Sequence, residues 1–307
     1  MSEIEQPNWI AGFWRRIGAF VIDLLILALL GYVLGLLMDD TLIQLGAWGR
    51  ALGFVIAVGY FGVQESRLCN GQTMGKRLLS IAVVDTQGQA LSLPQSLLRA
   101  AVFSLPVSLN NAQLPTDIGM VLTFLLMLII FAGSLSFAYF LIFNRATRQT
   151  PYDLLVGALV VKTDFDAQPI EPIWRGHYAV ASALIASVLL LLFVTTKVWL
   201  PPQIGVQLTT VRTAIESEPE VMRAWISTNL PQNNLPARHS FLAINVLLDN
   251  RSIDNPELAK KLATMAVFAD ASVAEKDIIL VQLTYGYDIG FSSFWRAQSY
   301  NFTPADL

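Results

Sequence analysis

The sequence contains little charge for its length. Only 14% of its 307 residues are Asp, Glu, Lys or Arg, against about 25% in soluble globular proteins. A soluble chain of this size needs more charge to cover its surface, so we expect the excess apolar sequence to face lipid. The composition therefore favours an integral membrane protein that contacts the bilayer.

Cysteine and histidine are also scarce. The single cysteine, Cys69, excludes an internal disulfide framework and cannot alone form a cysteine-rich metal site. His177 and His239 are the only histidines, and neither has an acidic or cysteine cluster at ligand spacing. We expect no enzyme and no cofactor, since no nucleophile motif or cofactor loop is present. The net charge of −3 argues against nucleic acid as a partner.

Apolar runs are what the sequence has in abundance. Four charge-poor runs cover about residues 17–38, 48–64, 119–143 and 177–199. A helix needs roughly 20 apolar residues to cross a bilayer, and the second run is at the short end of that range. A fifth run, 99–114, carries Pro106 and several polar residues, so it is either an irregular span or a re-entrant segment.

Basic residues near the ends of spans stay preferentially on the cytoplasmic side. Arg15 and Arg16 precede the first run, and four bases follow each of the runs that end at residues 64 and 143. All ten of these basic residues lie on the same side of the membrane only if the 99–114 run crosses it. We therefore predict five spans, a cytoplasmic amino terminus that is not cleaved, and an extracytoplasmic position for residues after 199.

The composition changes after a Pro-Pro pair at 201–202. The predicted domains are a membrane domain at 1–176, a final transmembrane helix at 177–200 and a soluble α+β domain at 201–307. Within the last, we predict helices at 206–229 and 255–269, with Asn255 as the N-cap of the second. Strands are predicted at 277–288 and 293–302.

A small cytoplasmic β element is predicted between the spans. Residues 78–85 are rich in β-branched side chains, and a turn signal at 86–88 allows 89–93 to return as a partner strand. Residues 157–163 could add a third strand. The fold class is thus an α-helical multi-pass membrane protein with a small β element and a C-terminal α+β domain.

Asp23 is the one ionisable residue well inside a clear apolar run, about six residues or roughly 9 Å past its start. A carboxylate at that depth costs a few kcal/mol unless it is partnered. Arg16 lies on the same helix face but points away from Asp23, so we expect a base from another segment. The candidates are Arg99, Arg145, Arg148, Lys76 and Arg77. A buried ion pair and a proton or cation site both stay open as interpretations.

Two further motifs have structural interpretations. Thr150, three residues before Asp153 with a proline between them, is typical of a capping box, although Asp153 could also face Arg99 or Arg16. The segment 71–77, GQTMGKR, lacks the spacing of a phosphate loop. We expect Gly71 and Gly75 to serve a turn into a helix, and Lys76 and Arg77 to contact anionic lipid headgroups.

These motifs together resemble the RDD family of bacterial membrane proteins over about residues 12–163. The matching stretches are FWRRIGAFVIDLL, GQTMGKRLLSIAVVDTQGQALS, LLRAAV and NRATRQTPYDLLVGALVV. The resemblance implies that Arg16, Asp23 and Asp153 are the family arginine and two aspartates. It also matches Thr73, Gly75, Lys76 and Arg99 to recurring positions. Tyr152 stands where members often carry a histidine, and Ala158 replaces a frequent threonine.

The resemblance implies a bacterial inner-membrane protein involved in transport, since some members have been proposed to exchange cations for protons. Our leading hypothesis is an exchanger in which Asp23, tuned by Arg16 and a base such as Arg99, binds a proton or small cation. In this exchanger, Asp153 closes the cytoplasmic end of the ion site. The alternative is a non-transporting membrane partner, in which the Arg/Asp set locks the helices and the C-terminal domain binds another protein.

Overall fold

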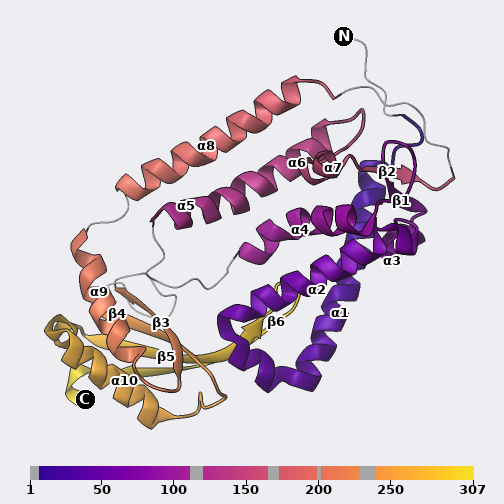
Figure 1. The fold of residues 1–307 in the computed structure, drawn as a ribbon. Coiled ribbons are helices and arrows are strands. Elements are labelled where there is room, and N and C mark those ends of the chain that lie inside the picture. The colour runs from indigo at the N-terminus through magenta and orange to yellow at the C-terminus, as the bar shows by residue number, and fades with distance from the viewer. Residues whose placement is uncertain (1–6, 111–119, 165–172, 199–201, 229–239) are drawn as a thin grey trace. The chain divides into compact units, whose positions relative to one another are not determined.

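The computed structural model describes residues 7–110, 120–164, 173–198, 202–228 and 240–307 (Figure 1). By packing, the chain divides into two units, which are described separately below. The membrane unit comprises Met1–Val33, Ala47–Thr195 and Ile289–Ser292. The C-terminal unit comprises Leu34–Gly46, Thr196–Asp288 and Ser293–Leu307. This division includes part of the first helix in the C-terminal unit, which the sequence did not indicate.

The chain's first helix, α1 (Phe13–Leu45), is bent at Met38, where the backbone leaves helical geometry at φ −139° and ψ 27°. The first predicted apolar run ends at this same residue. Beyond the bend come a short 3-10 turn, η1 (Gly46–Trp48), and α2 (Gly49–Gln64). The bend therefore separates an apolar segment from a polar one that begins with Asp39.

Three helical stretches among the described residues are long and apolar enough to cross a membrane: Phe13–Gln64, Leu122–Phe143 and Gly176–Val194. Their surfaces are apolar where they are exposed, as at Leu25 and Leu190. Exposed leucine over a whole helix surface suits lipid better than water. The structure thus supports the membrane class, and the count of five spans stays a prediction.

Of the remaining helices in the membrane unit, α4 (Leu93–Leu109) contains the marginal run. It begins with a capping box from Ser92 and Gln95, includes Pro106, and packs against α2. It is followed by α5 (Met120–Met127), the π-helical turn η3 (Leu128–Ala132), α6 (Gly133–Phe143), α7 (Pro151–Val156) and α8 (Gly176–Val198). The end of the run, 111–114, lies outside the described residues.

A two-stranded antiparallel sheet joins β1 (Ile81–Val84) to β2 (Leu159–Lys162). It confirms two of the three predicted strands. The third prediction, a strand at 89–93, is wrong, because this segment makes only single bridges, from Ala90 to Val84 and from Leu91 to Ser66. The next residue, Ser92, already caps α4. The short helices η2 (Arg67–Cys69) and α3 (Met74–Leu78) lead into β1.

The C-terminal unit contains a four-stranded sheet in the order β3-β4-β5-β6. Strands β4 and β5 are parallel and the other neighbours are antiparallel. The strands are β3 (Val221–Thr228), β4 (Phe241–Leu248), β5 (Ile278–Asp288) and β6 (Ser293–Phe302). The helices are α9 (Pro202–Ile215), α10 (Pro256–Ala269), η4 (Ala271–Glu275) and η5 (Pro304–Asp306). Helix α10 connects the parallel pair, as parallel strands require.

Sequence reasoning located α10, β5 and β6 correctly, and the Asn255 side chain caps α10 by accepting from the Leu258 amide at 3.0 Å. The predicted helix 206–229 is wrong in its second half. Helix α9 ends at Ile215, and Val221–Thr228 forms strand β3. Pro219 lies between them and cannot continue a helix. Strand β4 was not predicted.

One face of the sheet is covered by α9 and α10, and Leu262 of α10 is fully buried in the core between them. Removing its side chain leaves a cavity, which typically costs about 2–5 kcal/mol. We expect Leu262→Ala to speed amide hydrogen exchange in β4 and β5 of the full chain. The control is Phe268→Ala on the same helix, because Phe268 is 86% exposed. Equal exchange in both variants would contradict this packing.

Candidate functional site

Asp23 lies on α1 with no exposed surface. Three hydrogen-bond donors surround its carboxyl group. The Tyr60 hydroxyl of α2 donates to Oδ1 at 2.8 Å, the Thr73 hydroxyl to Oδ2 at 2.6 Å, and the Gly75 amide to Oδ1 at 2.9 Å. Hydrogen bonds of this kind offset the cost of burying a carboxyl group.

The expectation that a base pairs with Asp23 is therefore wrong. Within the described part of the chain, no lysine or arginine forms an ion pair with it, and this holds for all five candidate bases. Hydroxyl and amide donors from α2 and the start of α3 supply the partners instead. Sequence reasoning missed Tyr60, because a tyrosine in an apolar run carries no signal of its hydrogen bond.

Thr73 and Gly75 bring the start of α3 onto α1. Thr73 is the N-cap of α3 and accepts from the Lys76 amide at 3.2 Å while its hydroxyl donates to Asp23. A Cβ atom on Gly75 would lie 2.1 Å from the carbonyl oxygen of Ala19 on α1. The motif 71–77 is thus a turn into a helix, as predicted, and glycine at 75 is required for close approach.

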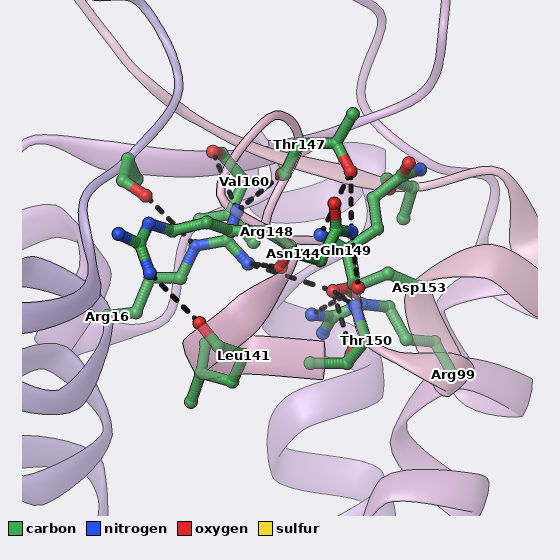
Figure 2. Close-up of polar contacts among 12 residues, drawn as sticks. Arg16, Arg99, Leu141, Asn144, Thr147, Arg148, Gln149, Thr150, Asp153 and Val160 are labelled. Atoms are coloured by element: carbon green, nitrogen blue, oxygen red, sulfur yellow. Dashed lines mark hydrogen bonds and ion pairs between the residues drawn. The ribbon is translucent and has the colours of Figure 1, made fainter. Parts of the chain in front are cut away.

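Asp153 has the predicted capping role and a second one. Its Oδ2 accepts from the amide and hydroxyl of Thr150 at 3.0 and 2.8 Å, which completes a capping box at α7. Its Oδ1 accepts from Nε and Nη2 of Arg99 at 2.8 and 2.7 Å. Arg16 is more distant, with Nη1 3.8 Å from Oδ2 (Figure 2).

Glu65, directly after α2, continues this network and was missed from the sequence. Its Oε1 is 2.6 Å from the Lys76 ammonium, and its Oε2 pairs with Nη1 of Arg99. The expectation that Lys76 contacts lipid headgroups is therefore wrong, because its ammonium pairs with a buried carboxylate. Only 2% of its side chain is exposed. An acidic residue immediately after a charge-poor run, two residues before Arg67, was the available signal. Asp153, Arg99, Glu65 and Lys76 thus form one buried chain of alternating charge, here called the charge chain.

The pKa values of the groups around this chain follow from burial and neighbouring charges. Burial raises the pKa of the Glu65 carboxyl, but Arg99 and Lys76 outweigh it and hold this pKa below its ordinary value of 4.5. Burial, and then the Asp153 charge, raises the pKa of the Tyr152 phenol to about 12. Tyr152 therefore does not replace the titratable histidine that the family resemblance leads one to expect at this position.

Arg16 binds mainly backbone oxygens. Its guanidinium donates to the carbonyl groups of Ala11 at 3.2 Å, Arg148 at 2.6 Å, Val160 at 3.3 Å and Thr147 at 3.4 Å. Figure 2 shows it among the loop that precedes α7 and strand β2. Arg16 therefore fastens the start of α1 to this loop, since carbonyls buried there need donors.

A cavity of about 180 Å³ lies beside the charge chain. Arg16, Glu65, Lys76 and Arg99 form its polar part. Aromatic and aliphatic side chains form the rest: Ile17, Phe20, Phe61, Phe103, Phe137, Ala138, Leu141, Tyr152 and Val160. Asp23 is not among the lining residues. The structure thus brings Arg16, Arg99 and Asp153 together and places Asp23 in a separate, closed environment.

Metal-ligating groups do not gather at either place. Across the ranges that the structure describes, no group of three His, Cys, Asp or Glu side chains could hold a metal ion. The oxygens of Asp23 and Asp153 are instead occupied by hydroxyl, amide and guanidinium donors. The arrangement can hold helices together, and it places the positively charged side chains of Arg16, Lys76 and Arg99 in the cavity wall.

The close approach of α3 to α1 gives a first prediction for this site. Gly75→Ala is expected to lower the melting temperature of the solubilised protein strongly, because its Cβ meets backbone that cannot move aside. Gly59→Ala is the matched control, since a Cβ there meets nothing within 4 Å. A melting temperature for Gly75→Ala equal to that of the control would show that α3 does not lie against α1.

The lowered pKa of Glu65 gives a prediction for acid stability. A carboxyl group whose pKa is lower in the folded state stabilises the fold above its unfolded pKa, and this stabilisation disappears as the pH falls through the folded pKa. We expect wild-type melting temperatures to fall as the pH drops below about 4.5. Glu65→Gln should melt lower at neutral pH and lose part of this dependence. Parallel pH profiles for the two proteins would contradict the pairing.

Of the comparisons with known proteins, the one with family models finds a match. A model of the RDD family matches residues 10–157, a range that contains Arg16, Asp23, Arg99 and Asp153. No curated protein and no solved structure is significantly similar to the chain. The motifs that carried the resemblance in the sequence are those that the fold brings together around Asp23 and Asp153. Over residues 10–157, a little under half of the chain, the sequence thus matches the RDD family.

Proposed function

We propose that this protein is a non-transporting membrane partner whose Arg/Asp set locks its helices, while its C-terminal unit binds another protein. It acts without an enzymatic step. The observation that carries the proposal is Asp23, which is fully buried, hydrogen-bonded by three uncharged donors and absent from the cavity wall. The leading hypothesis from the sequence required this carboxylate to exchange ions.

Cation exchange at Asp23 conflicts with its surroundings. A small hard cation needs several oxygen ligands at short distance, whereas both Asp23 oxygens accept hydrogen bonds from Tyr60, Thr73 and Gly75. Binding a cation would require these donors to turn away. For the amide of Gly75 this means moving α3, which contacts α1 through the same glycine.

The charge chain supports the locking role. It links the end of α2 through Glu65, α3 through Lys76, α4 through Arg99 and α7 through Asp153. Removing one partner of a buried ion pair strands the other charge and costs about 3–5 kcal/mol. Arrangements of this kind favour one packing of the helices over alternatives.

The C-terminal unit supplies the surface for a partner. Edge strand β6 exposes most of its side chains, including Phe294 and Trp295. Exposed aromatic residues on a sheet edge are typical of interaction surfaces. From the distribution of basic residues, we infer that the protein lies in the bacterial inner membrane with its amino terminus cytoplasmic and this unit extracytoplasmic.

Transport is the second candidate, and the cavity is the observation that favours it. Arg16, Glu65, Lys76 and Arg99 line a space large enough for a small solute. A transporter would use these residues, with Asp23 still serving packing. The two candidates therefore differ in whether anything crosses the membrane.

Everted vesicles carrying a pH gradient separate the two candidates. Adding Na⁺, K⁺ or Li⁺ should collapse the gradient no more than in vesicles without the protein, because nothing crosses the membrane in the proposed role. Protection of the C-terminal unit from added protease confirms the orientation of the vesicles. A cation-dependent collapse that wild-type vesicles show and protein-free vesicles lack would overturn the proposal in favour of transport, and its loss in a folded Asp23→Asn variant would place the exchange at Asp23.

A further inference from the structure

The cavity beside the charge chain has one charged end and an otherwise apolar wall. Lys76, Arg99 and Arg16 lie at the charged end with Glu65, and the side chains of α1, α2, α4 and α6 supply aromatic and aliphatic surface. Pockets with a few convergent polar groups in an apolar wall are the usual form of small-ligand sites.

Positive charge exceeds negative charge at this end. Three cations, Arg16, Lys76 and Arg99, face two carboxylates, Glu65 and Asp153, within the described cluster. Asp153 is further occupied by Thr150 and does not line the cavity. One positive charge therefore remains uncompensated next to an apolar space, where an anion gains more from pairing than it would in water.

Donors are available to receive such an anion. An ammonium group has three N–H donors, and Lys76 uses one of them on Glu65 in the part of the chain that is described. Arg99 has five N–H donors and directs Nε, Nη1 and Nη2 at Glu65 and Asp153. Two N–H groups of Lys76 are thus the donors most free to bind a ligand oxygen.

We propose that this cavity binds a small amphipathic anion, a carboxylate or phosphate monoester attached to an aromatic or short aliphatic group. Its anionic oxygens would accept from Lys76 and Arg99, and its apolar part would lie against Phe61, Phe103 and Phe137. A cavity of about 150 Å³ in another protein holds benzene, so about 180 Å³ accommodates one ring or a short chain with its charged group.

A cation is not expected here. Glu65 is already paired on both oxygens, and two of the rings that line the cavity already face a cation of the protein. The Lys76 ammonium lies 5.9 Å from the centroid of Phe61, and the Arg99 guanidinium 5.0 Å from that of Tyr152. These contacts leave the remaining apolar wall to an uncharged portion of the ligand.

Ligand-detected ¹⁹F NMR on the full chain in phosphatidylcholine nanodiscs tests the proposal with three matched probes. They are 4-fluorobenzoate, the neutral 4-fluorobenzyl alcohol and the cationic 4-fluorobenzylamine. We expect saturable binding of the benzoate and at least tenfold weaker binding of the alcohol and amine. Absence of benzoate binding, or equal binding of the alcohol, would overturn the proposal.

Two variants locate the binding, and one serves as control. Lys76→Met removes the ammonium and keeps a similar length, and Ala138→Trp fills the cavity from α6 without altering a charge. Each should weaken benzoate binding at least tenfold, whereas exposed Arg77→Met beside Lys76 should leave it unchanged. The ligand would lie elsewhere if Arg77→Met weakened benzoate binding as much as Lys76→Met does. It would also lie elsewhere if a folded Ala138→Trp variant bound benzoate as well as the wild type.

The source of the anion is distinguished by adding phosphatidic acid to the nanodiscs. If a lipid phosphate is the natural occupant, this lipid should compete with 4-fluorobenzoate and weaken its binding. If a free solute is the occupant, the binding should not change. Either result keeps the anion site, and both are independent of the vesicle assay, so the site and the proposed function can fail separately.

Discussion

The pairing of Arg99 with two carboxylates is the interaction on which the rest of the membrane unit depends. Its guanidinium lies between Glu65, at the end of α2, and Asp153, in the first turn of α7, and Arg99 is only 6% exposed. A guanidinium in that position needs its partners, because a buried unpaired charge is far more costly than a buried pair. Helices α2, α4 and α7 are therefore fixed in relation to one another by one side chain.

The other buried groups follow from this arrangement. Each carboxylate that Arg99 contacts has a second partner, Lys76 for Glu65 and Thr150 for Asp153, so both carboxylates are fully paired. Asp23 lies apart from it and is held by uncharged donors instead. Asp23 and Asp153 thus make different contacts, the first with uncharged donors and the second with a guanidinium, and neither aspartate lines the cavity.

Patterns of local sequence predicted much of this fold. The capping box at α7, the Asn255 cap, strand β6 and the turn at 71–77 depend on residues close together in the chain, so their spacing was informative. The pairing of Asp153 with Arg99 was a possibility that the sequence left open. Tyr60 and Glu65 were not predictable as partners of Asp23 and Arg99, because they approach from another helix. Strand β3 was hidden in a pattern that also suits a helix, and only Pro219 marked the break.

A double-mutant cycle between Arg99 and Glu65 tests the central claim most directly. The free energy of unfolding of the full chain would be measured for wild type, Arg99→Gln, Glu65→Gln and the double variant. Coupling of contacting residues in one network is typically about 0.5–3 kcal/mol, so the double variant should be more stable than the sum of the single losses predicts. Strictly additive losses would show that the two side chains do not hold each other, and would contradict the lock.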